Sequence, residues 1–100
     1  MNTITSHQDG KNLMIQITGT FDLSAFDNFH QAYPSDMSNI STITVDLARV
    51  VEVDSSAIGM LLSLWKVAGQ EKGKVIIINA NASVKELLQI GLVTQYIDIK

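Results

Sequence analysis

The alternation of apolar and polar residues predicts short β-strands. Leu13, Ile15 and Ile17 recur at every second position and would share one buried face of a strand. The turn residues Asp9-Gly10 precede this strand and predict an antiparallel hairpin with an N-terminal extended segment. Val75 to Ile78 is apolar without alternation, which is typical of a strand covered on both faces. The strands predicted after the turn cover residues 13–18, 42–47, 75–78 and 96–99.

Helical periodicity fills the intervals between these strands. The predicted helices cover residues 24–33, 55–71 and 83–90. Pro34 would end the first helix, because the residue before a proline is pushed out of helical geometry. Gly73 and Gly91 would follow the other two. The apolar stripe predicted for the second helix consists of Ile58, Leu61, Leu62, Trp65 and Ala68.

The order of these elements predicts the fold class. The second half of the chain reads β-α-β-α-β, which favours parallel strands joined by right-handed crossovers. With the N-terminal hairpin, this predicts an α/β sandwich with a mixed sheet of four to five strands and helices packed mainly on one face. Residues 1–100 contain no linker or repeat and are expected to form a single domain.

Composition narrows the possible functions. The net charge of −3 and a pI near 5.1, with seven scattered Lys and Arg residues, give no basic surface for nucleic acid. The sequence has no cysteine for disulfides or thiolate metal sites, and its N-terminus has no signal-peptide pattern. We therefore expect a cytoplasmic protein without direct membrane insertion.

Two adjacent serines provide the main candidate site. Ser55 and Ser56 follow Asp54 where a strand is expected to lead into the second helix. Asp54 or Ser55 would cap that helix, since a short side-chain oxygen accepts from first-turn amides. Ala57 and Met60 are predicted to form a small exposed patch beside the serines. Simple capping by the serines is the structural alternative.

The sequence gives less support to a metal-binding receiver domain or to a hydrolase. Asp22, Asp46 and Asp54 are predicted near strand ends and could bind Mg²⁺ as in a receiver domain, but the chain is too short for five βα units. Ser55 with His7 or His30 could suggest a hydrolase, yet there is no Gly-x-Ser-x-Gly motif. The sequence therefore predicts no catalytic residue, no metal site and no cofactor.

The sequence around Asp46 and Asp54 resembles that of a known protein family. Val45-Asp46-Leu47 followed by residues 53–62 resembles the signature of STAS domains, specifically bacterial anti-sigma factor antagonists. Gly19-Thr20-Phe21-Asp22, residues 72–75, 84–88 and Ile90-Gly91-Leu92 resemble further family segments. One departure is Ala57, which stands where many members have glycine.

The resemblance implies a partner switch instead of catalysis. In that family the unmodified domain binds an anti-sigma factor or a serine kinase of the HATPase type, and phosphorylation blocks binding until a PP2C-type phosphatase reverses it. Transferred to this sequence, the phosphoacceptor is Ser55, with Ser56 as second choice. Partner contacts would involve Asp22, Asp54, Ser55, Ser56, Ala57 and Met60.

Two further roles occur among STAS domains. One is a constitutive accessory subunit of an ABC-type transporter, where the same surface would remain permanently bound. The other is nucleotide binding, against which the lack of a basic or glycine-rich pocket motif argues. Ser55 directly after Asp54 favours the switch, because an accessory subunit needs no phosphoacceptor.

Overall fold

The computed structural model describes residues 2–91 and 93–100 and is built on one five-stranded sheet with the order β1-β2-β3-β4-β5. β1 pairs antiparallel with β2, whereas β2, β3, β4 and β5 are parallel neighbours. The predicted hairpin and mixed sheet are thus confirmed. The strands are β1 (Asn2–Asp9), β2 (Asn12–Phe21), β3 (Thr42–Val53), β4 (Val75–Ile78) and β5 (Asp98–Ile99).

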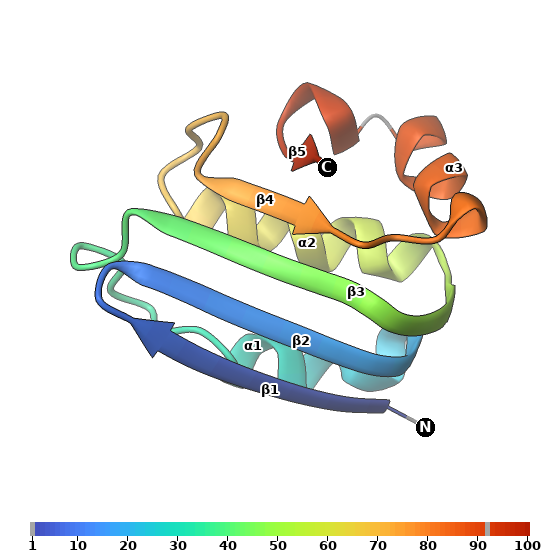
Figure 1. Cartoon of the computed structure of the whole chain (residues 1–100), viewed down its shortest axis with the longest axis horizontal. Helices are drawn as coiled ribbons and strands as arrows, with labels where there is room; N and C mark the ends of the chain where they lie inside the picture. Colours follow the sequence, from blue (N-terminus) through green and yellow to red (C-terminus); the bar gives the residue numbers. More distant parts are fainter. Residues whose placement is uncertain (1, 92) are drawn as a thin grey trace.

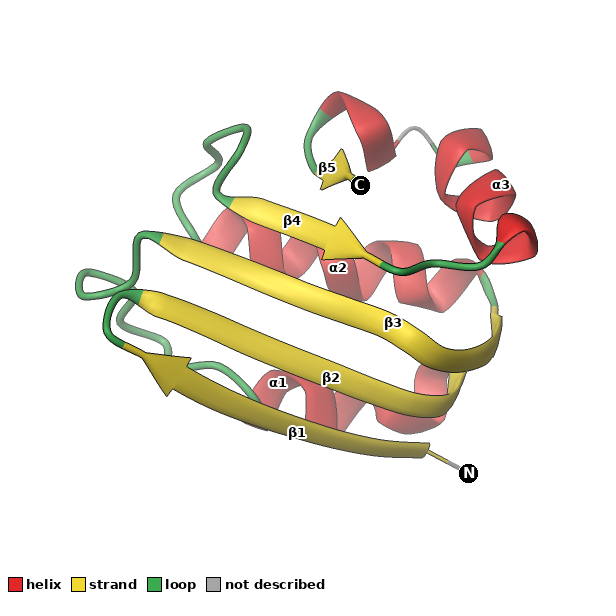
Figure 2. Cartoon of the chain, in the orientation of Figure 1, coloured by secondary structure: helices red, strands yellow, loops and turns green. Residues whose placement is uncertain are grey.

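The helices cover mainly one face of this sheet. Figure 1 shows α1 and α2 behind the sheet and α3 beside the end of β4. The other face of β1, β2 and β3 is left open in this view (Figure 2). None of the helices in the described part of the chain has the length and apolar character needed to span a membrane. The helical elements are η1 (Leu23–Ala25), α1 (Phe26–Gln31), α2 (Ser55–Val67), α3 (Ala82–Ile90) and η2 (Val93–Gln95).

The core lies between the sheet and α1 and α2. Leu13, Ile15 and Ile17 of β2 are buried, as their spacing predicted. In β4, Val75 and Ile77 are buried while Ile76 and Ile78 are only half-buried, so the prediction of full cover on both faces is wrong. The reason is that the helices cover one face of the sheet. Further buried residues include Phe21 at the end of β2 and, from other elements, Phe29, Ile43, Val45, Leu47, Leu61, Leu64 and Leu88.

Several element boundaries differ from those predicted. β3 continues to Val53 instead of ending at residue 47, because its register against β2 shifts twice and the strand remains paired. The first helix is shorter than residues 24–33 and is preceded by the 3-10 turn η1. The last strand contains only Asp98–Ile99, and Tyr96 is exposed. Leu92, part of one segment that resembles the family, lies outside the described residues.

The buried face of α2 is rotated from the predicted stripe. Leu61 and Ala68 are buried as expected, but Ile58, Leu62 and Trp65 are only half-buried. α2 carries apolar residues on the face toward the sheet and also on a second face. The C-terminal segment partly covers this second face, where the ring centroids of Trp65 and Tyr96 lie 4.8 Å apart. Periodicity alone could not assign the face that contacts the sheet. The residues on that face are Ala57, Met60, Leu61, Leu64 and Ala68.

We expect Leu61→Ala to lower the free energy of unfolding by about 2–5 kcal/mol, since Leu61 is fully buried between α2 and the sheet. Leu62→Ala removes the same atoms from the next, half-buried position and should cost clearly less. Urea denaturation of both variants measures the difference. Equal losses would contradict this orientation of α2.

Candidate functional site

Two acidic residues are brought together where neighbouring parallel strands end. Phe21 at the end of β2 pairs with Val53 at the end of β3. Asp22 and Asp54 follow these paired residues directly, and each precedes a helical turn. The prediction that Asp22 lies at a strand end is confirmed. Because parallel strands end at the same edge of a sheet, residues 32 positions apart in sequence become neighbours.

Asp54 caps α2. Its backbone is extended, and its carboxylate oxygen Oδ1 accepts from the Ser56 amide at 2.9 Å and from the Ser56 hydroxyl. Its carbonyl oxygen accepts from the Ala57 amide at 3.1 Å. Asp54 therefore satisfies two first-turn amides of the helix and fixes the residue at which α2 begins. Of the two caps predicted, the structure selects Asp54 over Ser55.

Asp22 repeats this arrangement at η1. Its Oδ1 accepts from the Ser24 amide at 3.0 Å and from the Ser24 hydroxyl, and its carbonyl accepts from the Ala25 amide at 3.0 Å. The sequence pattern is Asp-x-Ser-Ala at residues 22–25 and again at residues 54–57. In this pattern the position of Ser55 corresponds to Leu23. The repeated pattern is the signal from which Leu23 could have been identified as part of the site.

The two serines differ in their surroundings. Ser55 is the first residue of α2 and is exposed. Ser56 is half-buried, and both its amide and its hydroxyl are bonded to Asp54. Among the described residues, no hydrogen bond of comparable kind engages the Ser55 hydroxyl. The Ser55 hydroxyl is thus accessible to a modifying enzyme without breaking the cap.

The prediction of an exposed patch formed by Ala57 and Met60 is wrong. Ala57 is 0% and Met60 3% exposed, because both lie on the α2 face that packs against the sheet. Asp46 was also predicted at a strand end, but it lies within β3. The Asp46 carboxylate accepts from the Ala48 amide at 2.9 Å.

Acidic side chains surround a small hollow beside the cap. Asp22, Glu52 and Asp54 line it together with Thr20 and Val53, and its volume is about 140 Å³. The described residues contain no group of three or more acidic, His or Cys side chains arranged to hold a metal ion. The hollow is acidic because Asp22, Glu52 and Asp54 line it. Sequence reasoning missed Glu52 because residues 48–53 were not assigned to a strand.

Apolar residues flank the acidic hollow. Leu23 is 66% and Val51 72% exposed. Val51 also lines a hollow of about 530 Å³ between the end of β3 and α3, with Val84 and Leu87 among its walls. An exposed hydroxyl, carboxylates and bare apolar side chains thus occur on one edge of the molecule. Exposed apolar residues with a polar rim can mark a surface that binds another molecule.

The histidines do not contribute to this site. His7 is exposed in the C-terminal half of β1 and pairs with Met14, and His30 Nδ1 lies 2.8 Å from the Tyr33 hydroxyl. Neither lines the hollow beside Asp54. The pairing of either histidine with Ser55, considered for hydrolysis, is thus not formed.

Comparison with known proteins identifies the family. The family model described as "Mlab, STAS domain" matches residues 4–97. The chain belongs to the STAS domain family. A STAS-domain containing protein of Pseudomonas aeruginosa (strain UCBPP-PA14) is 39% identical over 83 residues, which cover 83% of this chain and 82% of that protein.

Solved structures support the fold. The anti-sigma factor antagonist SpoIIAA in its unphosphorylated form has a TM-score of 0.72 at 16% identity, covering 98% of this chain and 87% of that one. Bacillus SpoIIAA in its phosphorylated form has a TM-score of 0.67 at 16% identity, covering 98% and 91%. This chain thus shares its fold with these two structures.

The Asp22 cap should respond to acid. The hydrogen bond from the Ser24 hydroxyl, helped by the Ser24 amide, holds the pKa of Asp22 below its ordinary value of 3.8. A lowered folded-state pKa stabilises the fold above pH 3.8, and this contribution is lost as the pH falls through the lower folded value. NMR titration of the Asp22 carboxyl should show that Ser24→Ala raises its pKa toward 3.8. The same pKa in both proteins would contradict the capping geometry.

Proposed function

We propose that this protein is a phosphorylation-controlled protein-binding switch. In the proposed cycle, the unphosphorylated form binds an anti-sigma factor or a serine kinase of the HATPase type in the cytoplasm. Phosphorylation of Ser55 blocks that complex, and a PP2C-type phosphatase restores it. The protein acts in this cycle as a binding partner and kinase substrate and not as an enzyme.

The observation that carries this proposal is the difference between the two serines. A kinase must reach a hydroxyl and remove its proton, which is easiest for an exposed side chain. Ser55 meets this condition, whereas the Ser56 hydroxyl is engaged by Asp54. SpoIIAA, which has this fold, has been solved in an unphosphorylated and in a phosphorylated form, so this fold can carry a phosphate in one of its states.

The surroundings of Ser55 support an effect on binding. A phosphoryl group adds about −1.5 to −2 charges at neutral pH. It would be added beside Asp54, near the acidic hollow that Asp22 and Glu52 also line. A partner that covers this surface would have to desolvate the additional charge, which is unfavourable unless matching cations are present. We propose Asp22, Asp54, Ser55 and Ser56 as contacts, with Leu23 and Val51 as apolar contacts. Ala57 and Met60 would support this surface from the core.

We expect the cognate kinase to phosphorylate Ser55 and not Ser56. Ser55→Ala should abolish incorporation, whereas Ser56→Ala should retain it, since the Asp54 carboxylate still accepts from the amide of residue 56. Tandem mass spectrometry of the three proteins after incubation with the kinase locates the phosphate. Phosphate found only on Ser56 would refute the assignment.

We expect Ser55→Asp to weaken partner binding by about tenfold or more, because it adds a carboxylate to an acidic surface. Its free energy of unfolding should change by less than about 1 kcal/mol, since negative charge is tolerated at a helix N-terminus. Ser55→Ala should keep binding and resist regulation. Binding titrations and calorimetric melting of each variant test both effects.

Ser41→Asp is a matched control, because Ser41 is exposed just before the opposite end of β3. It should leave binding unchanged. If enzymatically phosphorylated wild-type protein bound its partner with unchanged affinity, the switch proposal would fail. The constitutive accessory subunit of an ABC-type transporter would then be the better explanation.

A further inference from the structure

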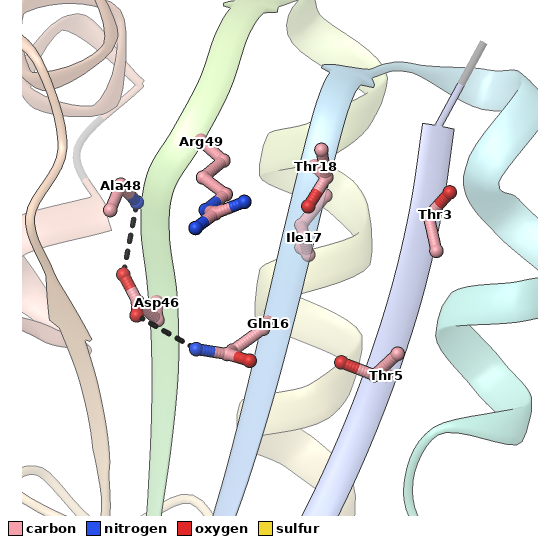
Figure 3. Close-up of a pocket in the computed structure, with 8 residues that line it drawn as sticks. All are labelled: Thr3, Thr5, Gln16, Ile17, Thr18, Asp46, Ala48 and Arg49. Atoms are coloured by element: carbon pink, nitrogen blue, oxygen red, sulfur yellow. Dashed lines mark hydrogen bonds between the residues drawn. The ribbon is translucent and has the colours of Figure 1, made fainter.

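A third hollow lies on the open face of the sheet, separate from the two hollows near the end of β3. Its volume is about 320 Å³, which is within the lower range of ligand pockets. β1, β2 and β3 each contribute side chains, and none of them lines the acidic hollow beside Asp54. The lining residues are Thr3, Thr5, Gln16, Ile17, Thr18, Asp46, Ala48 and Arg49 (Figure 3).

An irregularity in β3 creates this arrangement. Gln16 pairs with Asp46, but Thr18 pairs with Arg49, so β3 contains one additional residue between these pairs. Leu47 and Val50 are buried, while Ala48 and Arg49 between them are both exposed. The extra residue therefore places a cationic side chain on the same open face as Asp46. Strict alternation from Asp46 would have directed Arg49 toward the core.

The Asp46 carboxylate is held in place by three donors. Oδ1 accepts from the Ala48 amide at 2.9 Å and from Asn79 Nδ2 at 3.2 Å, and Oδ2 accepts from Gln16 Nε2 at 3.3 Å. These bonds and the nearby Arg49 charge outweigh the opposing effect of burial and keep the pKa of Asp46 below 3.8. Asp46 is thus ionised at neutral pH and has a fixed orientation.

Arg49 interacts with the Asp46 carboxylate through its charge and not through a hydrogen bond among the described residues. The hydrogen bonds to this carboxylate come from Ala48, Asn79 and Gln16. Figure 3 shows its guanidinium extending from β3 toward β2, with Thr18 beyond it. The Thr5 hydroxyl in the same view is directed toward β2. A guanidinium presents several donors in one plane, which suits carboxylate and phosphate groups.

We propose that this hollow binds a small polar molecule that carries an oxyanion, a carboxylate or a phosphate, together with a hydroxyl or amino group. The oxyanion accepts from Arg49 and from threonine hydroxyls. The hydroxyl or amino group of the ligand donates to the Asp46 carboxylate or to the side-chain carbonyl oxygen of Gln16. The threonine, glutamine and charged side chains offer few apolar contacts, so a hydrophilic molecule fits better than an apolar one.

Amide NMR titration of the full chain tests this proposal with four probes. sn-Glycerol 3-phosphate carries a phosphate with hydroxyls, and L-serine carries a carboxylate with an amine and a hydroxyl. Inorganic phosphate lacks a carbon-bound hydroxyl or amino group beside the oxyanion, and glycerol lacks the anion. We expect saturable shifts at Gln16, Thr18, Ala48 and Arg49 with one or both of the first two probes. Which of them binds distinguishes a phosphorylated from a carboxylate ligand.

Two variants test the roles of the charged groups. Arg49→Ala should weaken binding of the active probe by about tenfold, whereas Lys66→Ala removes an equal charge from α2 and should not. Asp46→Asn, once its spectrum shows the native fold, should reduce the preference for the active probe over inorganic phosphate.

Several results would contradict the proposed ligand site. Unchanged affinity in Arg49→Ala, or equal affinity for inorganic phosphate, would overturn the proposed recognition. The proposal also fails if no probe gives saturable shifts at about 10 mM, where a site with a Kd of 1 mM would be about nine-tenths filled. Protection of the same amides only in a complex with a regulator protein would assign this face to protein binding instead.

Discussion

The parallel pairing of β2 and β3 determines the geometry on which the proposed switch depends. The two strands remain paired through to Phe21 and Val53 despite two register shifts. Asp22 and Asp54 therefore start their helical turns at the same sheet edge, and each makes the same set of hydrogen bonds to the Ser and Ala that follow. The exposed positions between Asp and Ser are occupied by Leu23 and Ser55. One strand pairing thus places the proposed apolar contact Leu23 and the proposed phosphorylation site Ser55 at the same sheet edge.

Local patterns in the sequence were sufficient to predict the mixed sheet, the buried face of β2 and the start of α2. Leu13, Ile15 and Ile17 indicated the buried face of β2, and the order of elements indicated the mixed sheet. The Asp-Ser-Ser sequence located the start of α2 to within one residue. These features follow from alternation, capping and topology rules that act over a few residues or between successive elements.

The remaining features depend on contacts between distant segments. Ala57 and Met60 are buried because the sheet contacts their side of α2, and an apolar second side made the phase ambiguous. The strand pairing that extends β3 to Val53 brings Glu52 to the site, and the irregularity near Ala48 exposes Arg49. No pattern within residues 48–53 distinguishes these positions, because the register shift exists only in the pairing with β2. Periodicity is therefore least informative where the strand is irregular.

The same contacts explain why a charge on Ser55 should act on binding more than on folding. A helix N-terminus usually stabilises a phosphate through its free amides. Here the Ser56 and Ala57 amides already donate to Asp54, so less of that stabilisation is available to a phosphoryl group on Ser55. Its charge would instead be exposed to water beside other carboxylates, where solvent screening keeps the effect on the fold small. Covering this surface with a partner removes the screening water, and the accumulated negative charge then opposes the complex. The cap that defines the start of α2 would therefore also leave the proposed phosphate on Ser55 with few donors inside its own protein.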